Sequence, residues 1–283
     1  MRLVTFESAG GMPRVGIISK EHVVPISAES LSDMRSFLAQ GEAAFNAAKT
    51  LAEGRVASGE RFALNQVKLL APVTRPGKII AVGLNYRDHA AETKMEIPSS
   101  PVIFAKFPSS INGPDADVVL PDDDPQADYE AELAVVIGRK AKAVSETAAL
   151  DYVAGYMPLN DVSARRWQFA DKQWVRGKSC DTFCPTGPWL TTIDEVADPH
   201  ALAIEMRVNG KTMQKSNTSD LIFRIPALLQ FISAAITLEP GDIIATGTPA
   251  GVGVFRKPPL FLQRGDVMEV EIERLGTLRN KVV

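Results

Sequence analysis

The chain has 283 residues, of which 45% are hydrophobic and 23% charged, ordinary values for a folded globular protein. Its 31 Lys and Arg residues against 34 Asp and Glu give a formal net charge of -3, which offers no electrostatic basis for binding nucleic acid or an anionic membrane. No apolar run approaches the roughly 18 residues that cross a bilayer, and the two cysteines are too few for a disulfide framework. We therefore expect a cytoplasmic protein without nucleic-acid or membrane partners.

Residues 1–70 are predicted to form a small α/β domain. The Pro- and Gly-rich stretch Ala71–Gly77 that follows has the composition of a linker, so that residues 71–283 form a second, larger domain. Within the first domain, a break at Gly54 ends the second of two helices. The predicted elements are strands over Leu3–Phe6, Val15–Ser19 and Val23–Pro25, a helix from Ser30 or Ser32 to about Gly41, and a helix over Ala43–Ala52.

A candidate catalytic pair lies in the helix predicted for Tyr86–Glu92, directly after the short strand Lys78–Val82. His89 and Glu92 are three residues apart, so they share one face of a helix and can touch. A carboxylate beside an imidazole orients the ring and favours its charged form, which suits a general base. A solvent-facing pair on an ordinary helix has the same spacing and is the alternative. We expect residues 86 to about 100, which include this helix and most of the polar, mobile segment Lys94–Pro101 after it, to act as a lid.

Acidic side chains at alternate positions begin the strand predicted for Asp128–Ile137. Because side chains alternate along a strand, Asp128, Glu130 and Glu132 point the same way. Like charges buried together repel, and a divalent cation removes the conflict. Oxygen ligands without His or Cys favour Mg²⁺ or Mn²⁺ over Ca²⁺ and Zn²⁺. The solvated face of an edge strand is the alternative. Asp161, at the end of the next predicted strand, can converge on Glu130 and Glu132.

The basic, loop-like segment Trp174–Pro185 brings a candidate cation to this cluster, because Lys178 would balance the carboxylates and could bind an acidic substrate. The stretch Gly247–Gly253 lacks the signatures of a P-loop or a dinucleotide site, but its backbone N–H groups could hold a carboxylate. A serine-hydrolase elbow, Gly-x-Ser-x-Gly, does not occur. Further predicted elements are strands over Pro101–Phe107, Ala116–Leu120, Tyr152–Leu159, Ile243–Thr246 and Val267–Glu273, helical stretches from Ser145, over Ser163–Lys172 and over Asp220–Ile236, and a hairpin around Asn209–Gly210.

Five stretches between about residues 72 and 283 resemble the fumarylacetoacetate hydrolase family, in the family's order. They are GLNYRDHAAE, DYEAELAVVIG, YVAGYMPLNDVSARRWQ, GKSCDTFCPTGPWL and EPGDIIATGTPAGVG. The resemblance implies a β-rich α+β fold, with a mixed β-roll core in the C-terminal domain behind the small α/β N-terminal domain. It also implies a homodimer.

The same resemblance implies a role for each matching residue. One position departs from the family pattern: Arg166 stands in Ala164-Arg165-Arg166 where Ala-Arg-Asp is common, and it is either a surface residue or a substrate contact. The implied metal is Mg²⁺ or Mn²⁺. The implied roles are metal binding by Glu130, Glu132 and Asp161, catalysis by His89, Glu92 and Lys178, and substrate binding by Arg165, Gln168 and Thr248.

The function expected from residues and resemblance is metal-dependent hydrolysis of a carbon–carbon bond in a 2,4-diketo acid, an acylpyruvate, to pyruvate and a carboxylic acid. His89, held by Glu92, would activate the attacking water. The branch of the family that acts on 2,4-diketo-3-deoxy sugar acids is one version of this expectation. The alternative on the same scaffold is a decarboxylase or isomerase of oxaloacetate or a related 2-oxo diacid. A third possibility is a non-catalytic protein that binds metal and carboxylate.

Overall fold

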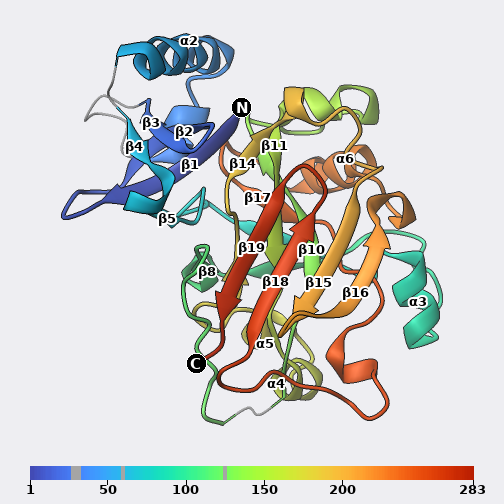
Figure 1. Cartoon of the computed structure of the whole chain (residues 1–283). Helices are drawn as coiled ribbons and strands as arrows, with labels where there is room; N and C mark the ends of the chain where they lie inside the picture. The colour runs from blue at the N-terminus through green and yellow to red at the C-terminus, as the bar shows by residue number, and fades with distance from the viewer. Residues whose placement is uncertain (27–32, 59–60, 124–125) are drawn as a thin grey trace.

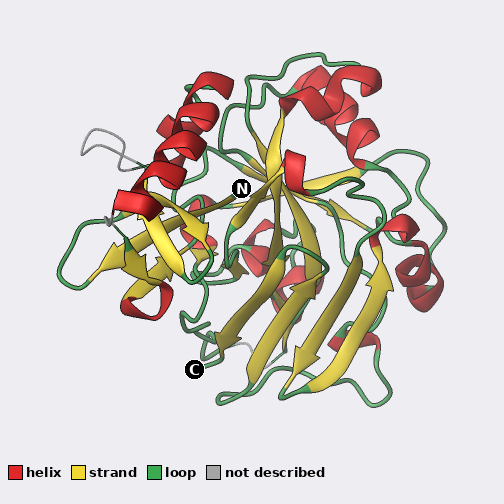
Figure 2. Ribbon diagram, turned by 45° about the horizontal axis from the view of Figure 1, so that its top comes forward, coloured by secondary structure: helices red, strands yellow, loops and turns green. Residues whose placement is uncertain are grey.

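Two sheets form the framework of the protein, as the computed structural model shows for residues 1–26, 33–58, 61–123 and 126–283 (Figures 1 and 2). The larger sheet is mixed, because β17 pairs with β6 in parallel and with β10 in antiparallel orientation. The expected β-rich, mixed α+β fold is confirmed. The order of the larger sheet is β4 (Phe62–Ala63), β3 (His22–Pro25), β2 (Arg14–Ser19), β1 (Arg2–Ser8), β14 (Leu190–Thr192), β11 (Val153–Asn160), β10 (Ala131–Ile137), β17 (Ile243–Ala245), β6 (Ile79–Gly83) and β7 (Val102–Lys106), with β5 (Val67–Leu70) on β1.

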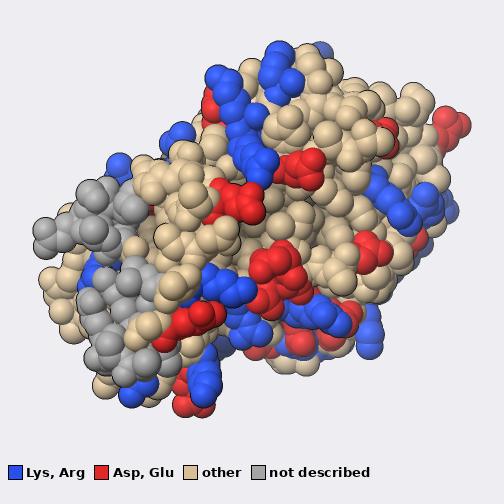
Figure 3. All heavy atoms as spheres, turned by 90° about the horizontal axis from the view of Figure 1, so that it is seen from above, with Lys and Arg blue, Asp and Glu red and all other residues tan. Residues whose placement is uncertain are grey.

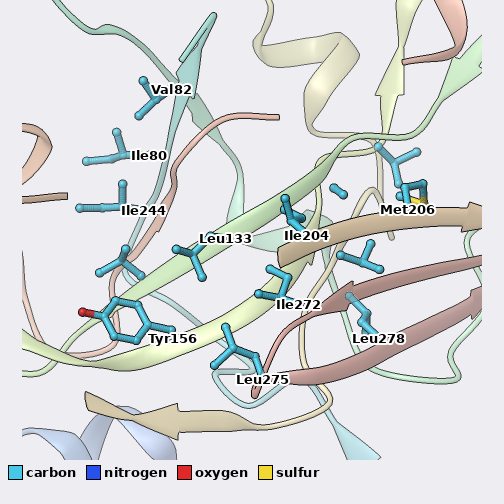
Figure 4. Close-up of a cluster of buried hydrophobic side chains, with 14 of the residues drawn as sticks. Ile80, Val82, Leu133, Tyr156, Ile204, Met206, Ile244, Ile272, Leu275 and Leu278 are labelled. Carbon is cyan, nitrogen blue, oxygen red and sulfur yellow. The ribbon is translucent and has the colours of Figure 1, made fainter. Parts of the chain in front are cut away.

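The smaller sheet is antiparallel and packs against one face of the larger one. Figure 4 shows Leu133 of the large sheet between Ile244 of the same sheet and the small-sheet residue Ile272. Strand β10 is buried on both faces, because Leu133 belongs to this core while Ala134 belongs to a second one beneath α1. Such a strand reads as a continuous apolar run. The small sheet consists of β16 (Lys211–Asn217), β15 (Ala203–Val208), β18 (Val267–Ile272) and β19 (Gly276–Lys281).

The N-terminal strands extend the large sheet, because β1 pairs with β14 through Arg2↔Thr191 and Leu3↔Leu190. The three predicted N-terminal strands are confirmed as β1, β2 and β3. A boundary near residue 70 stays a prediction about folding units, while the sheet itself runs across it. Two short pairs complete the strands: β9 (Ala127–Asp128) with β12 (Ser163–Ala164), and β8 (Ile111–Asn112) with β13 (Cys184–Pro185).

The helices are short apart from α2, which continues through Gly54 to Ser58, so the predicted end at Gly54 is wrong. One glycine costs a helix only about 1 kcal/mol, which its neighbours can offset. Asp33 caps α1 through the Arg35 N–H group, whereas the predicted caps Ser30 and Ser32 lie outside the described residues. The α-helices are α1 (Met34–Leu38), α2 (Glu42–Ser58), α3 (Arg87–Thr93), α4 (Arg165–Ala170), α5 (Val175–Lys178) and α6 (Ile225–Ala235).

Several predicted elements need correction. The segment Ala116–Leu120 is extended but forms only one isolated bridge, Val118↔Val282, instead of a strand. The stretch after Ser145 is a 3₁₀-helix, Glu146–Tyr152, and the predicted loop Trp174–Pro185 contains α5. The remaining 3₁₀-helices are Leu64–Gln66, Pro108–Ser110, Ile193–Glu195, Thr218–Asp220 and Gly253–Phe255.

Two other predicted elements in the C-terminal third can be compared directly with the structure. Helix α6 begins at Ile225, later than predicted, with Pro226 in its first turn, a position where the missing N–H group costs nothing. The hairpin between β15 and β16 is confirmed, with positive φ angles of 52° and 73° at Asn209 and Gly210.

Four strand ends meet at one edge of the large sheet. The parallel pairing of β6 and β17 places both of their carboxyl ends at this edge, next to the loops after Gly83 and Ala245. Strand β10 runs antiparallel to β17 and β11, so its beginning and the end of β11 lie there as well. This edge carries all the residues for which the sequence predicts a functional role.

Charge is mixed on the surface, and on the face seen in Figure 3 Lys and Arg side chains alternate with Asp and Glu. The net charge of -3 is consistent with this mixture. Among the described residues, no helix has both the length and the apolar character needed to cross a membrane.

Candidate active site

Three carboxylates converge because two antiparallel strands bring them to the same place. Ala131 of β10 pairs with Asn160 of β11, and the Asp161 N–H group donates to the Glu130 carbonyl oxygen at 2.9 Å. Asp161 therefore lies beside Glu130, and the strand alternation adds Glu132. One carboxylate oxygen from each of the three lies within 4.8 Å of the others, and all three side chains are buried. The predicted grouping of Glu130, Glu132 and Asp161 is present in the structure.

Two buried lysines neutralise part of this cluster. Lys178 Nζ donates to Glu130 Oε2 at 2.7 Å and to Asp161 Oδ2 at 2.8 Å. Lys106 Nζ donates to the other Asp161 oxygen, Oδ1, at 2.6 Å and also contacts the Lys178 carbonyl oxygen. Lys178 was predicted, whereas Lys106 was not. A lysine at the end of an otherwise apolar strand was the available signal.

Arg165 joins Glu130 to Asp128. Its guanidinium lies 2.7 Å from Glu130 Oε1 and 2.8 Å from Asp128 Oδ2. Asp128 stays outside the metal-ligand cluster, although the alternation placed it on the same side. It accepts hydrogen bonds from the Gly253 and Val254 N–H groups at 2.7 and 3.0 Å, so it fixes the Gly-rich loop to β9.

The buried charges do not balance. Burial acts to raise the pKa of Glu130, but Lys178 and Arg165 outweigh it and bring that pKa to about 2. Burial, with repulsion from Asp161 and Glu130, raises the pKa of Glu132 well above its usual range. When all are ionised, one negative charge is in excess among the buried groups of this edge: Asp128, Glu130, Glu132 and Asp161 against Lys106, Arg165 and Lys178.

This donor set fits a divalent cation. Among the described residues, Glu132 has no ion pair with a lysine or arginine, and its Oε2 accepts only a backbone hydrogen bond, from Gly247 at 2.7 Å. A cation beside Glu132 would supply the missing charge. Three carboxylate oxygens without sulfur or imidazole are hard ligands of the kind that Mg²⁺ and Mn²⁺ prefer. Glu130, Glu132 and Asp161 would hold the ion.

The Gly247 backbone reaches Glu132 because the loop passes very close to the strand end. Its φ angle is 105°, and a Cβ atom there would lie 2.8 Å from the Asn85 side chain. Asn85 in turn donates to the Thr246 and Phe223 carbonyl oxygens at 2.7 and 3.0 Å. Glycine is therefore required at position 247 by both its conformation and its surroundings.

The predicted pair of His89 and Glu92 is formed on α3. His89 Nδ1 lies 2.9 Å from Glu92 Oε2, and Glu92 Oε1 accepts a hydrogen bond from the Gly251 N–H group at 2.9 Å. The carboxylate is thus held by the same Gly-rich loop that contacts Glu132. Because Nδ1 is engaged, Nε2 is the ring nitrogen left for proton exchange with a ligand.

Two polar side chains are oriented for binding by neighbours that occupy their other atoms. Gln168 Oε1 accepts from Arg165 at 2.9 Å, which leaves its NH₂ group to donate. Thr248 Oγ1 accepts from Gln214 Nε2 at 2.7 Å, which leaves its hydroxyl hydrogen to donate. Gln214 was not predicted. It is buried in a strand and also accepts from Ala131 at 2.9 Å, so it joins the Gly-rich loop to β10.

A single pocket of about 120 Å³ connects these groups. It is smaller than the roughly 300–1,000 Å³ of drug-sized sites and suits a small acid. Arg166 is exposed and is not among the described residues of its wall, so its side chain belongs to the surface. Glu92 and Asp161 do not line the pocket but contact the lining residues His89 and Lys178. The other predicted site residues line its wall: His89, Glu130, Glu132, Arg165, Gln168, Lys178 and Thr248.

The site therefore consists of a buried acidic cluster at the strand ends of a β-rich, mixed α+β fold. The family model described as "Fumarylacetoacetate (FAA) hydrolase C-terminal" matches residues 78–283, and a model described as "Rv2993c-like, N-terminal" matches residues 1–72. The chain belongs to the fumarylacetoacetate hydrolase family. The resemblance inferred from five short stretches is confirmed.

Relatives within the family have different activities in their names. The chain is 46% identical over 291 residues to "Oxaloacetate tautomerase fahd2, mitochondrial" of Xenopus laevis, covering 100% of this chain and 90% of that one. It resembles the structure of 5-carboxymethyl-2-hydroxymuconate delta-isomerase from Mycobacterium smegmatis, with 36% identity, a TM-score of 0.81 and coverage of 100% and 99%. It also resembles the structure of maleylpyruvate hydrolase from Sphingobium sp. SYK-6 in complex with manganese(II) ion and pyruvate, with 34% identity, a TM-score of 0.82 and coverage of 100% and 99%.

The names of these relatives support the two expected functions to different extents. The expected family and scaffold are shown, but the expected hydrolysis of an acylpyruvate is supported only by some structural neighbours. The alternative, chemistry on oxaloacetate or a related 2-oxo diacid, agrees better with the relative named a tautomerase. The homodimer and the cytoplasmic location stay predictions.

Proposed function

We propose that this chain is a divalent-metal-dependent tautomerase of 2-oxo acids that interconverts the enol and keto forms of oxaloacetate. The reaction moves one proton between carbon 3 and the oxygen on carbon 2. The observation that carries the proposal is the shared pocket, in which a His–Glu pair faces a buried carboxylate cluster. The relative named an oxaloacetate tautomerase supports this reaction over others.

The metal is proposed to be Mg²⁺ or Mn²⁺, held by Glu130, Glu132 and Asp161. When bound, it would supply a Lewis-acid charge beside the 2-oxo and carboxylate oxygens of the substrate. The manganese-containing neighbour supports a metal of this kind. Gln168 and Thr248 would donate hydrogen bonds to the substrate carboxylate, since both have a donor left for a ligand.

His89 is proposed to move the proton. In the keto-to-enol direction, Nε2 takes a proton from carbon 3, and the electron pair of the broken bond forms the carbon 2–carbon 3 double bond. Glu92 holds the ring through Nδ1 and stabilises the charged imidazolium that results. A positioned base of this kind typically contributes ~10²–10⁴ in rate.

Lys178 is proposed to stabilise the negative charge that develops on the 2-oxygen. Burial acts to lower its pKa, but Asp161 and Glu130 raise it, which keeps the side chain an ammonium ion. Two of its three N–H groups donate to Glu130 and Asp161, and its Nζ lies 5.3 Å from the centroid of the Phe104 ring, so the substrate would meet the third N–H group on the side of that ring. A fixed positive charge in a buried pocket stabilises an enolate without reorganisation.

Hydrolysis of an acylpyruvate is the second candidate, because the same His–Glu pair could activate a water molecule and because a structural neighbour is named a hydrolase. The two reactions differ in what they release. Hydrolysis breaks the bond between carbons 3 and 4 and yields pyruvate and a carboxylic acid, whereas tautomerisation leaves the carbon skeleton intact.

Proton NMR of one enzyme preparation distinguishes the two. We expect that, with Mn²⁺ or Mg²⁺, enol oxaloacetate converts to the keto form faster than in the buffer control, while acetylpyruvate remains uncleaved. Release of pyruvate and acetate from acetylpyruvate at a higher catalytic efficiency, without acceleration of oxaloacetate tautomerisation, would establish the hydrolase instead.

A further inference from the structure

The outer part of the active-site pocket is apolar. Beyond the carboxylate cluster its wall is formed by aromatic and aliphatic side chains, while the cations Arg165 and Lys178 lie at the inner end and are engaged with carboxylates. Oxaloacetate has only polar groups and gives no reason for such a wall. The apolar wall, as we name it, consists of Met95, Phe104, Phe169, Trp174 and Phe255.

Part of the apolar wall is held rigidly. The Trp174 ring packs on Gly83, where a Cβ atom would lie 2.7 Å from the ring. Phe104 meets Trp174 edge to face, with ring centroids 5.3 Å apart. Phe255 lies beside His89, with centroids 6.0 Å apart. Packing within the fold therefore fixes Trp174 and Phe104, while Phe255 lies next to the proposed proton-transfer group.

Three side chains of the apolar wall remain exposed. Phe169 is 60% exposed, Met95 59% and Phe255 40%. Large apolar side chains gathered at the mouth of one polar pocket mark a surface that a ligand or partner covers. A substrate that enters carboxylate-first would place its distal end against these three side chains.

The side chains that line the pocket indicate which chemical group the distal end of the substrate carries. Besides Arg165 and Lys178, His89 is the only basic side chain among the described residues lining the pocket, and Glu92 is already its partner. A carboxylate on carbon 3, as in oxaloacetate, leaves the apolar surface of these rings uncovered. An apolar group would instead bury both its own surface and that of the wall.

We propose that the pocket takes 2-oxo acids with an aryl group on carbon 3 as substrates, with the ring seated on the apolar wall. This inference rests on the proposed function, because the 2-oxo acid end binds as described for oxaloacetate. The step is the same: the carbon 3 proton passes to His89 Nε2, the electron pair forms the double bond between carbons 2 and 3, the carbonyl π electrons move to the 2-oxygen, and Nε2 returns the proton to that oxygen. Phenylpyruvate is the simplest acid of this class.

Calorimetry tests the binding part without turnover. In the presence of Mn²⁺, we expect N-phenyloxamate, which has the shape of phenylpyruvate, to bind at least tenfold more tightly than oxamate. Phe169→Ser should reduce this preference at least threefold. Phe231→Ser, at a residue of α6 that is 40% exposed and not among the described residues of the pocket, is the matched control and should leave the preference unchanged.

The outcomes separate the inference from the proposed function. Equal affinities of the two oxamates, or a preference that survives Phe169→Ser undiminished, would overturn the inference while tautomerisation of oxaloacetate could still be observed. Turnover of oxaloacetate without turnover of phenylpyruvate would also overturn it. Tight binding of N-phenyloxamate with no tautomerisation of either acid would refute the proposed function and leave the apolar binding wall in place.

Discussion

Replacing Lys106 with methionine separates the stability of the carboxylate cluster from its affinity for metal. Lys106 is 1% exposed and donates to Asp161 Oδ1 at 2.6 Å, and the variant keeps most of the apolar volume while removing the charge. Removing one partner of a buried ion pair costs roughly 3–5 kcal/mol. Because Lys178 still neutralises Asp161 Oδ2, we expect the lower end of this range, about 3 kcal/mol, for the metal-free protein.

Thermal unfolding measures the first effect. A loss of ~3 kcal/mol lowers Tm by ~6–12 °C if each kcal/mol shifts it by ~2–4 °C, as in domains of 150–250 residues. The matched control is Lys140→Met. Lys140 is 69% exposed and lies 3.3 Å from Glu239, and exposed pairs of this kind contribute only ~0–1 kcal/mol.

The second effect has the opposite sign. Lys106 repels a divalent cation held by the same Asp161 carboxylate, so its removal should tighten Mn²⁺ binding. Two unit charges 4 Å apart interact by about 4 kcal/mol at an effective dielectric constant of 20, so even a third of this lowers Kd about tenfold. Calorimetry with Mn²⁺ tests this. Weaker Mn²⁺ binding, or a Tm equal to that of the wild type, would refute the electrostatic description of the cluster.

Three further predictions follow from other parts of the site and fold. His89→Ala should lower oxaloacetate tautomerisation by ~10²–10⁴ and Glu92→Gln by less, with Mn²⁺ affinity by calorimetry nearly unchanged; a large loss of metal affinity would contradict the assignment. His200 Nε2 accepts a hydrogen bond from the Ile225 N–H group at 3.1 Å. Burial and the nearby Arg224 lower the pKa of His200, although Asp198 acts to raise it. Just below pH 6.5 the unfolded state therefore binds more protons than the folded state, so the free energy of unfolding decreases by at most ~1.4 kcal/mol for each unit by which the pH is lowered. Urea melts of His200→Gln at several pH values should lack this pH dependence. Hydrogen exchange in residues 86 to about 100 should slow when oxalate and Mg²⁺ are added; unchanged exchange would mean that this segment is not a lid.

The carboxylate cluster could be predicted because its geometry is local. Glu130 and Glu132 are two residues apart, and strand alternation places them together without any knowledge of the fold. His89 and Glu92 follow from helix spacing in the same way. Asp161 required one further step, that two consecutive strands pair in antiparallel orientation, which is their commonest arrangement.

Lys106 and Gln214 could not be predicted because their roles depend on long-range pairing. Lys106 ends β7 and reaches Asp161 only because β7 lies beside β6 at the same sheet edge. Gln214 lies in the small sheet and contacts the large one through Ala131 and Thr248. Residue type marks Lys106 as unusual at the end of an apolar strand, but spacing along the chain does not identify the partner of either residue.

Two errors in the predicted elements have the same origin. The segment Ala116–Leu120 is extended and apolar in the way strands are, but its single bridge partner is the chain's C-terminal segment, and the pairing stops there. Helix propensity alone predicts the end of α2 at Gly54, whereas the helix continues to Ser58. Propensity is a weak preference that packing commonly overrides.

The central claim is that this chain moves a proton at carbon 3 of a 2-oxo acid with the help of a metal at Glu130, Glu132 and Asp161. The most direct measurement is the rate at which the ultraviolet absorbance of enol oxaloacetate decays, followed by stopped flow with Mn²⁺-loaded and with chelator-treated enzyme. We expect a rate far above the buffer rate for the loaded enzyme and a return to the buffer rate when the metal is removed. Equal rates for the loaded enzyme and for buffer containing the same Mn²⁺ concentration would contradict it.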